Sequence, residues 1–564
     1  MSRVVKKSPS VCVDLPLSNP DICNKLRLMK QLLSSCYGPR ARLKQVHNNI
    51  GGHVITTSTS SVLLPAIYSS QAFINMIKTS ILNHVSRFSD CGLFAAVFSL
   101  SLLEHVRKSG LGLNAAIRVN QHLLGLCTNY LQRDDCACKV KIDFCSSQNM
   151  ITLAHSVVSS KPACVLTESE KMHISNLSVQ AFLLTIPCSN PGTVSLGKVV
   201  TVTLEGHSVL SSAVFPGLLV DAPEGFCPIK VDSQMKMVLF SASLAGDLSE
   251  LGDGVIEMPP GVDTDTQILQ QLLELGNQVV KDEVQLFVCQ KVIHPVLQQY
   301  LRGHGVTVLE RVGITLMEPL RELTGAHPVG TLHTSIPPTA YGKVKDLSIR
   351  RFGSKTMLHL HPLGESSICT MILCHRNETM LNELKVVCQK TEHVLRFTLR
   401  EPSALLGGGC TETQLAAYVR HKSKQEVSET APVLGCSQTE YLLGVEAFCR
   451  SLESVAGSLE HDGGTSVVDL THAHHWTIPS DAMTQHMEHS MGFCGCGLVD
   501  SCPSNKWTYL NTEYTDFCPA PLLRDTLVQP SVLDSFTAKV NALHVAVETT
   551  NLALDVRCVI QDVN

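Results

Sequence analysis

This chain of 564 residues has little charge, since Asp, Glu, Lys and Arg make up only 17% of it. The formal net charge is −5, which excludes the basic surface that is typical of nucleic-acid-binding proteins. Apolar residues make up 44% of the sequence, as in a globular protein. The length exceeds what one hydrophobic core usually serves, so the sequence predicts two or three domains.

Long apolar runs are also missing. None approaches the roughly 18 residues that cross a bilayer, and no apolar signal core follows Met1–Ser8. We therefore expect the chain in the reducing cytosol or nucleus, with its 23 cysteines mostly buried as small hydrophobes rather than paired in disulfides. Among 24 histidines and 23 cysteines, no Ser-His-Asp or Cys-His nucleophilic pattern rises above chance pairs.

Helical patterns occupy both ends of the chain. Asn19-Pro20 supplies an N-cap and a first-turn proline for a helix that Gly38-Pro39 should stop. Apolar periodicity predicts further helices at about Leu93–Val106 and Leu113–Leu131, and a last one from about Phe536 to Val559. The sequence therefore predicts that both ends of the chain are mainly helical.

The middle of the chain alternates strands and helices at short spacing. The predicted strands are Val200–Leu204, Val284–Cys289 and Val306–Leu309, and the predicted helices are Thr264–Val280, Pro295–Leu301 and Thr315–Leu323. This alternation favours an α/β subdomain inserted into a helical domain, so both termini should belong to one unit.

Two glycine patterns are candidates for phosphate handling. In the run Leu406-Gly407-Gly408-Gly409-Cys410-Thr411-Glu412, three glycines let the backbone pack closely against a phosphate or another loop. The run Gly192-Thr193-Val194-Ser195-Leu196-Gly197-Lys198 fits the Walker A spacing, but Val199 stands where a hydroxyl should hold Mg²⁺. The second run also precedes a β-rich segment, so we expect a turn there instead of a phosphate loop.

A segment rich in Cys and His is the one candidate for a metal site. It contains His472, His474, His475, His486, His489, Cys494 and Cys496. Zinc would favour the set His486, His489, Cys494 and Cys496, but no standard Cys-x₂-Cys or His-x₃-His pair is present. We therefore expect a solvated loop without a metal.

Other motifs accompany the glycine triplet in a fixed order. They are Tyr37-Gly38-Pro39-Arg40, Ser89-Asp90-Cys91-Gly92-Leu93, the stretch from Ala154 to Lys161, Phe287-Val288-Cys289-Gln290-Lys291, Leu323-Thr324-Gly325-Ala326, and the final helix around Ala546–Leu554. On these motifs the chain resembles the group II (TCP-1/thermosome) chaperonin family, as a divergent relative. The resemblance covers most of the chain and is weakest from His472 to Val532.

The resemblance implies the fold class α+β multidomain, with a discontinuous helical equatorial domain, an intermediate hinge domain and an α/β apical domain. The expected ranges are 1–135 and 403–564 for the equatorial domain, 136–198 and 353–402 for the intermediate domain, and 199–352 for the apical domain. An irregular insertion is expected at about 472–532, and the apical domain would bind client or partner proteins.

The resemblance further implies a degenerate nucleotide site. ATP hydrolysis needs Mg²⁺ held by carboxylates and an acid that orients water. Asp90 aligns with one of the family's three aspartates, whereas Thr59 and Lys390 stand where the other two are expected. We therefore expect no catalytic residues and little or no hydrolysis.

Binding of ATP and Mg²⁺ without hydrolysis stays open at this stage. The residues that could hold the nucleotide are Gly38, Pro39, Asp90, Gly92, Lys161, Gly407, Gly408, Gly409, Asp462, Gly463 and Gly464. The other interpretation is that these glycines serve only the tight turns of the fold.

By resemblance, the chain would assist the folding or assembly of a multiprotein complex. The implied partners are other divergent chaperonin-like subunits and the cytosolic ring chaperonin, with subunits of the BBSome, a membrane-trafficking coat complex, as clients. The implied locations are the cytosol, the centrosome and the ciliary base. Two alternatives remain: an active ATP-hydrolysing subunit of a hetero-oligomeric chaperonin, and a zinc-dependent interaction module.

Overall fold

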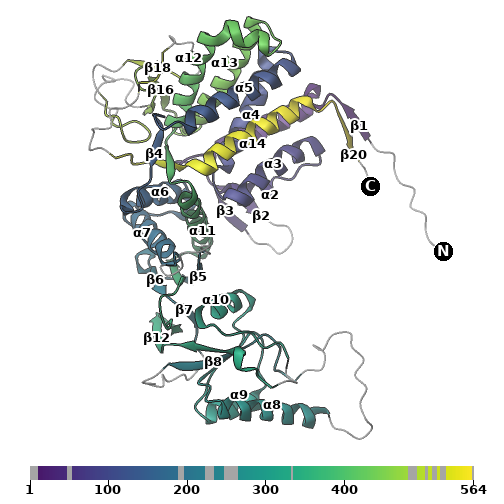
Figure 1. Cartoon of the computed structure of the whole chain (residues 1–564). Helices are drawn as coiled ribbons and strands as arrows, with labels where there is room; N and C mark the ends of the chain where they lie inside the picture. The colour runs from purple at the N-terminus through teal and green to yellow at the C-terminus, as the bar shows by residue number, and fades with distance from the viewer. Residues whose placement is uncertain are drawn as a thin grey trace, which may run out of the picture. The chain divides into compact units, whose positions relative to one another are not determined.

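The computed structural model describes residues 11–47, 54–187, 196–222, 234–246, 264–331, 335–480, 492–501, 506–510, 517–520 and 529–561. The chain forms two compact units (Figure 1). Unit 1 combines Met1–Val179 with Asn377–Asn564, and unit 2 is Gln180–Arg376. Both termini thus belong to one unit, as the sequence predicts.

Unit 1 is mainly helical. Its helices are α1 (Pro20–Ser34), α2 (Ser60–Ala66), α3 (Ala72–Phe88), α4 (Gly92–Ser109), α5 (Leu113–Gln132), α6 (Ser147–Ser159), α11 (Glu378–Arg400), α12 (Cys410–Val433), α13 (Gln438–Gly457) and α14 (Phe536–Asp555), and α7 (Glu168–Leu184) leads out of it. Its strands are β1 (Val11–Asp14), β2 (Lys44–His47), β3 (Val54–Thr57), β4 (Lys139–Lys141), β15 (Ser403–Leu406), β16 (Thr465–Asp469), β17 (His475–Ile478), β18 (Trp507–Tyr509), β19 (Leu533–Ser535) and β20 (Cys558–Gln561).

The core of unit 1 surrounds α4. This helix is apolar on nearly all faces, and most of its side chains from Leu93 to Val106 are buried. It packs against α1, α13 and α14 (Figure 1). A helix without a polar face must be covered on every side, which explains why four helices meet here. The predicted N-cap is also present, since the Asn19 side chain accepts a hydrogen bond from the Asp21 amide at the start of α1.

A three-stranded antiparallel sheet positions the glycine triplet. Its order is β19-β15-β4, with Leu406 of β15 opposite Leu533 of β19. All four residues of β15 are buried. The chain leaves β15 through Gly407–Gly409 and enters α12 at once, so the triplet is a strand-to-helix turn.

Unit 2 is built from sheets and helices, as the alternating pattern predicts. It contains β5 (Lys198–Glu205), β6 (Ala213–Pro216), β7 (Leu218–Asp221), β8 (Met235–Phe240), α8 (Thr264–Lys281), β9 (Leu286–Cys289), α9 (Pro295–Gly303), β10 (Thr307–Leu309), α10 (Ile314–Thr324), β11 (Tyr341–Val344), β12 (Leu347–Phe352), β13 (Lys355–Leu360) and β14 (Ile368–His375).

The largest sheet of unit 2 has the order β10-β9-β8-β11, with β8, β9 and β10 parallel. All four residues of β9 are buried, as expected for a parallel strand that is covered on both faces. Unit 2 contains the whole range 199–352 predicted as the apical domain and extends beyond it at both ends. The finer domain limits stay a prediction.

The Walker-A-like pattern does not form a phosphate loop in unit 2. Gly192–Ser195 lie outside the described residues, and Lys198 begins strand β5, which pairs in parallel with β14. A phosphate loop needs a helix at this point, because the amides of the helix N-terminus hold the phosphate. A Cβ on Gly197 would lie 1.7 Å from the Ser367 carbonyl oxygen, so close packing accounts for that glycine.

Two predictions at the C-terminal end were wrong. The last helix stops at Asp555, because the chain then forms β20, which pairs antiparallel with β1. The segment 472–532 is not wholly irregular, since β17 and β18 flank β16 in one sheet, with Trp476 buried against Trp507.

The expectation of a solvated Cys/His loop was wrong for its described part. His474, His475, Cys494 and Cys496 are all buried, whereas His486 and His489 lie outside the described residues. None of the helices in the described ranges combines the length and apolar character that crossing a bilayer needs.

Candidate nucleotide site

A cavity of about 580 Å³ lies in unit 1, where β15 ends and the helices α4 and α12 begin. Of the residues predicted from the sequence, those lining it are Gly38, Pro39, Asp90, Gly92, Lys161, Lys390, Gly408 and Gly409. These residues come from separate parts of the sequence, so the fold gathers most of the predicted site at one place.

Four predicted positions are not in the described lining: Gly407, Asp462, Gly463 and Gly464. Gly463 and Gly464 line a second hollow, which shares Glu460 with the first. Asp462 pairs with Arg40 across 3.6 Å, and both side chains are exposed. The Asp462-Gly463-Gly464 turn therefore borders the cavity without contributing to its described lining.

The loop around Asp90 has a backbone that favours glycine on both sides of Asp90, although neither neighbour is a glycine. Ser89 has φ +60° and Cys91 has φ +57°, both in the left-handed region. Each such residue without glycine's freedom costs on the order of 1 kcal/mol. The His84 ring nitrogen Nε2 lies 2.9 Å from the Asp90 carbonyl oxygen and helps to hold the loop. The fold therefore holds this loop in a conformation that its own residues do not favour.

The position of the second expected acid, Thr59, is buried and bonded to another acid. The Thr59 hydroxyl donates to Glu383 Oε1 at 2.7 Å, and the Thr57 hydroxyl donates to the same oxygen at 3.0 Å. Glu383 lies on α11, and its side chain is buried. Neither Thr59 nor Glu383 is among the described residues that line the cavity.

Lys390 stands where the third acid is expected and lines the cavity with only 7% of its surface exposed. Burial lowers the pKa of its ammonium group from 10.5 to about 7, and the nearby Lys161 adds to this effect. Asp90 and Glu383 act in the opposite direction without cancelling it. Near neutral pH this position therefore carries a partial positive charge, where hydrolysis would need a carboxylate.

A buried ion pair closes another side of the cavity. Lys539 of α14 bonds to Glu412 of α12 and, at 2.9 Å, to Asp534. Burial alone disfavours the ammonium, but the two carboxylates outweigh it and raise the pKa of Lys539 well above its ordinary value. Lys539 therefore stays charged and ties the helix after the glycine triplet to the C-terminal helix.

The first two glycines of the triplet are needed for packing. A Cβ on Gly407 would lie 2.6 Å from Val532 Cγ1, and a Cβ on Gly408 would lie 2.1 Å from the Gly495 carbonyl oxygen. Gly408 also has φ +63°. Since the backbone of Gly495 occupies the space beside Gly408, this glycine serves close packing between protein segments.

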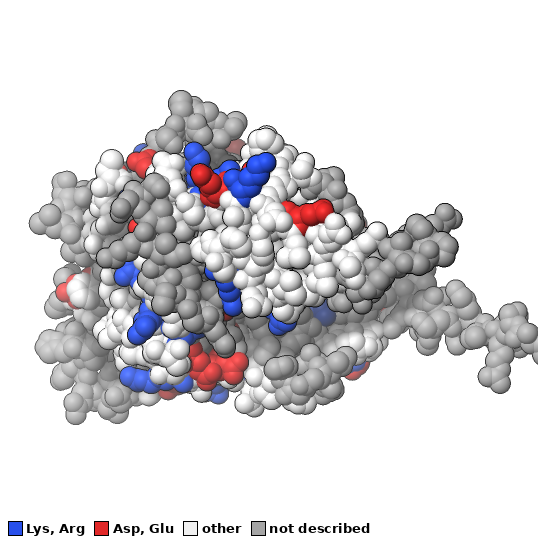
Figure 2. All heavy atoms as spheres, turned by 90° about the horizontal axis from the view of Figure 1, so that it is seen from below, with Lys and Arg blue, Asp and Glu red and all other residues white. Residues whose placement is uncertain are grey.

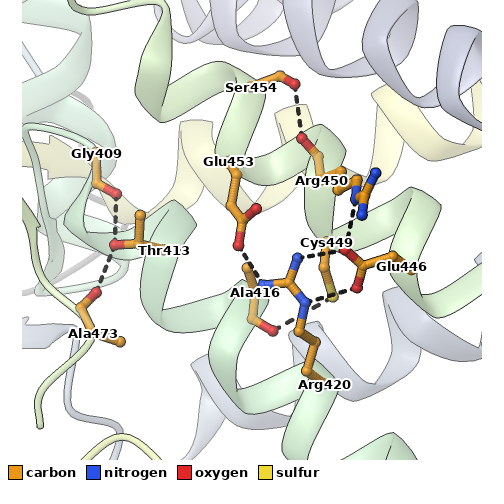
Figure 3. Close-up of polar contacts among 10 residues, drawn as sticks. All are labelled: Gly409, Thr413, Ala416, Arg420, Glu446, Cys449, Arg450, Glu453, Ser454 and Ala473. Atoms are coloured by element: carbon orange, nitrogen blue, oxygen red, sulfur yellow. Dashed lines mark hydrogen bonds and ion pairs between the residues drawn. The ribbon is translucent and has the colours of Figure 1, made fainter. Parts of the chain in front are cut away.

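Further along α12 from the triplet, a buried charge network joins α12 to α13 (Figure 3). Arg420 bonds to Glu446 at 2.9 Å and also to Glu453, which is fully buried. Burial raises the pKa of Glu446, but Arg420 and Arg450 outweigh burial and lower it overall. Nearer the triplet, the Thr413 hydroxyl lies between the carbonyl oxygens of Gly409 and Ala473, as Figure 3 shows.

Most acids in the described lining of the cavity are already engaged by other groups of the protein. Three carboxylates of its described lining are already engaged: Glu168 with His155, Glu460 with the amides of Asp462 and Gly464, and Asp534 with Lys539. Asp90 is left as the candidate metal ligand, and the charge of Lys390 opposes a cation beside it. This arrangement does not fit the set that hydrolysis needs.

Comparison with known proteins identifies the family. The profile of the TCP-1/cpn60 chaperonin family matches residues 29–564. The chain belongs to this chaperonin family. It is 45% identical to the human (Homo sapiens) protein named molecular chaperone MKKS over 572 aligned positions, which cover the whole of both chains, and 45% identical to the Mus musculus protein of that name. Identity is 21% to a thermosome subunit beta of Sulfolobus acidocaldarius, over 79% of this chain and 78% of that one.

Membership in the chaperonin family confirms the predicted fold class, an α+β multidomain subunit. Three site residues were missed in the sequence: Glu383, Asp534 and Lys539. Glu383 could have been found, because it precedes Lys390 by seven residues, or about two helical turns, and so shares its helix face. Asp534 and Lys539 gave no signal, since their importance depends on where α14 packs.

Proposed function

We propose that this chain acts as a chaperonin-like assembly factor, which binds client or partner proteins and has lost, or nearly lost, ATP hydrolysis. The observation that carries the proposal is Lys390, a buried lysine with a partial positive charge that lines the cavity where the family's acid is expected. Positioning and charge stabilisation supply most of the catalysis in phosphoryl transfer, so a cation at this point should nearly abolish hydrolysis.

The finer part of the proposal concerns partners and place. We propose that the chain works with other divergent chaperonin-like subunits and the cytosolic ring chaperonin, and that BBSome subunits are its clients. It would do so in the cytosol and at the centrosome and ciliary base. Support comes from the full-length identity of 45% to a protein named as a molecular chaperone.

Unit 2 is the proposed binding unit. In the view of Figure 2, charged side chains of both signs are scattered over a mainly uncharged described surface. Two apolar side chains at helix starts in unit 2 are exposed, Ile314 of α10 by 75% and Val296 of α9 by 41%. We propose Ile314 and Val296 as contacts for apolar segments of other proteins.

One observation favours the alternative, an active hydrolysing subunit. Glu383 is a buried carboxylate bonded to Thr59, the position of a lost acid, and it acts on the charge of Lys390. A shift of α11 that brought Glu383 to the cavity would restore a second acid. This alternative predicts that Glu383→Gln abolishes hydrolysis.

ATP hydrolysis by the purified full-length chain separates the two functions. We expect a rate at the level of a protein-free control, with no change in Asp90→Ala, because the acids that should act with Asp90 are absent. Glu383→Gln should likewise change nothing, and an active group II chaperonin serves as the positive control. Hydrolysis that Asp90→Ala and Glu383→Gln both abolish would overturn the proposal in favour of an active subunit.

A further inference from the structure

Three thiols and one imidazole meet in the interior of unit 1, next to the glycine triplet. Cys410, His474, Cys494 and Cys496 are all buried, and one nitrogen or sulfur atom from each lies within 4.8 Å of the others. The sequence places them far apart, in α12, in the turn before β17 and in the segment 492–499. Buried cysteines are common, but the convergence of four soft ligands from three segments on one point is not explained by apolar packing.

The separations are close to those of a tetrahedral metal site. The sulfurs of Cys494 and Cys496 are 3.3 Å apart, and His474 Nδ1 lies 3.2 Å and 3.4 Å from them. In a tetrahedral zinc site with Zn–S near 2.3 Å and Zn–N near 2.0 Å, ligand atoms are about 3.6–3.8 Å apart. Small side-chain movements would bring the four atoms to those separations.

The backbone around His474 and Cys494 is organised to hold them. The Asp469 carboxylate accepts hydrogen bonds from the amides of Thr471, His472 and His474, which fixes the turn that carries the imidazole. The Val499 amide donates to Cys494 Sγ at 3.2 Å. A hydrogen bond from a backbone amide to sulfur stabilises a thiolate, and hydrogen bonds to the ligands of a metal also orient them.

The third thiol is placed equally well. Cys410 is the first residue of α12, at the positive end of the helix, which acts against the burial that raises the pKa of this thiol. Gly497 has φ +79°, and its amide donates a hydrogen bond of 2.8 Å to the Cys494 carbonyl oxygen, which closes the turn Cys494–Gly497. The Cys494-Gly495-Cys496-Gly497 segment therefore forms a compact loop with both sulfurs on one side, beside Cys410 and His474.

We propose that Cys410, His474, Cys494 and Cys496 bind one zinc ion as a structural site. Four protein ligands of Cys₃His type fill the tetrahedron, which is typical of structural zinc. On binding, the three thiols lose their protons to solvent and the imidazole binds through Nδ1 as the neutral ring, so the site carries one negative charge. The sequence motif alone suggested His486 and His489 as ligands; both lie outside the described residues, and the described geometry brings Cys410 and His474 to Cys494 and Cys496.

The zinc would fasten the segment 492–499 onto the glycine triplet. Gly495 stands between two of the ligands, and its backbone packs against Gly408. The Gly495 amide donates to the His475 carbonyl at 2.8 Å, and His475 Nδ1 lies 2.9 Å from the Gly408 carbonyl oxygen. The metal would thus hold in place the wall of the cavity that Gly408 and Gly495 form.

Metal analysis of the full-length protein, purified in metal-free buffer without chelator, tests the proposal. We expect one equivalent of zinc per chain, and X-ray absorption at the zinc edge should show three sulfurs near 2.3 Å and one nitrogen near 2.0 Å. In Cys494→Ala/Cys496→Ala the zinc content should fall at least tenfold. If that variant does not fold, the zinc content and absorption spectrum of the wild type decide the question.

A matched control is available at Cys136 and Cys138. This pair has the same spacing, the same Sγ–Sγ distance of 3.3 Å and the same burial, but it belongs to no candidate ligand group in the described chain. Cys136→Ala/Cys138→Ala should therefore keep its full zinc content. A wild-type protein without zinc, zinc retained in Cys494→Ala/Cys496→Ala, or a Cys494–Cys496 disulfide would each overturn the proposal.

Discussion

Replacing Lys390 by methionine should stabilise unit 1, most strongly at low pH. The pKa of Lys390 is about 7 in the fold against an ordinary 10.5, so between these values the unfolded chain binds more protons than the folded one. The free energy of unfolding of the wild type should therefore rise with pH across this window. The destabilisation caused by the buried ammonium should be at its full size below pH 7. The advantage of Lys390→Met should shrink by about 2–3 kcal/mol between pH 6 and pH 9.

Urea unfolding of wild type and Lys390→Met at pH 6 and pH 9 measures this effect. Lys385 is a matched control, since it is a partly exposed lysine on the same helix α11. Lys385→Met should show no pH-dependent advantage over the wild type. An advantage of Lys390→Met that is the same at both pH values would show that the ammonium is not buried as described.

Removing Arg420 should destabilise unit 1 more than any other single charge removal in the network of α12 and α13. Arg420→Met leaves the fully buried Glu453 without its cation and removes one partner of Glu446. Breaking a buried ion pair from one side costs about 3–5 kcal/mol, because the remaining charge is uncompensated. The urea midpoint of the variant should fall accordingly.

Two further variants give this result its meaning. Adding Glu453→Gln to Arg420→Met should recover more than half of the lost stability, because the buried negative charge of Glu453 is removed. Arg450→Met is the control, since Arg450 bonds to the same Glu446 at 2.7 Å but is 37% exposed; its loss should be below about 1 kcal/mol. Equal losses in Arg420→Met and Arg450→Met would contradict the buried network.

Much of the fold could be predicted from the sequence, because its helices carry strong local signals. The N-cap at Asn19, the apolar stretch from Leu93 to Val106 and the alternation in the middle of the chain each correspond to an element of the structure. The strand β20 gave no such signal, because it exists through its pairing with β1 at the other end of the chain. Local periodicity does not contain long-range pairing of this kind.

The candidate site was harder to predict than the fold. Asp90 and Lys390 could be placed by motif, but the burial that lowers the pKa of Lys390 depends on how α11 packs. Cys91 illustrates a second difficulty: a cysteine gives no local signal for the left-handed conformation that it adopts at φ +57°. Cys410 follows the glycine triplet without any local pattern that indicates a ligand, because its proximity to His474 is a tertiary contact.

The native mass and subunit composition of the tagged chain, isolated from cell lysate as wild type and as Asp90→Ala, test the central claim most directly. We predict a large particle that contains cytosolic chaperonin and other divergent chaperonin-like subunits, with the same composition for both proteins, because assembly should not depend on nucleotide at Asp90. A particle near the size of one chain would contradict the proposed assembly role. A large particle that forms with the wild type and is lost in Asp90→Ala would contradict independence from nucleotide.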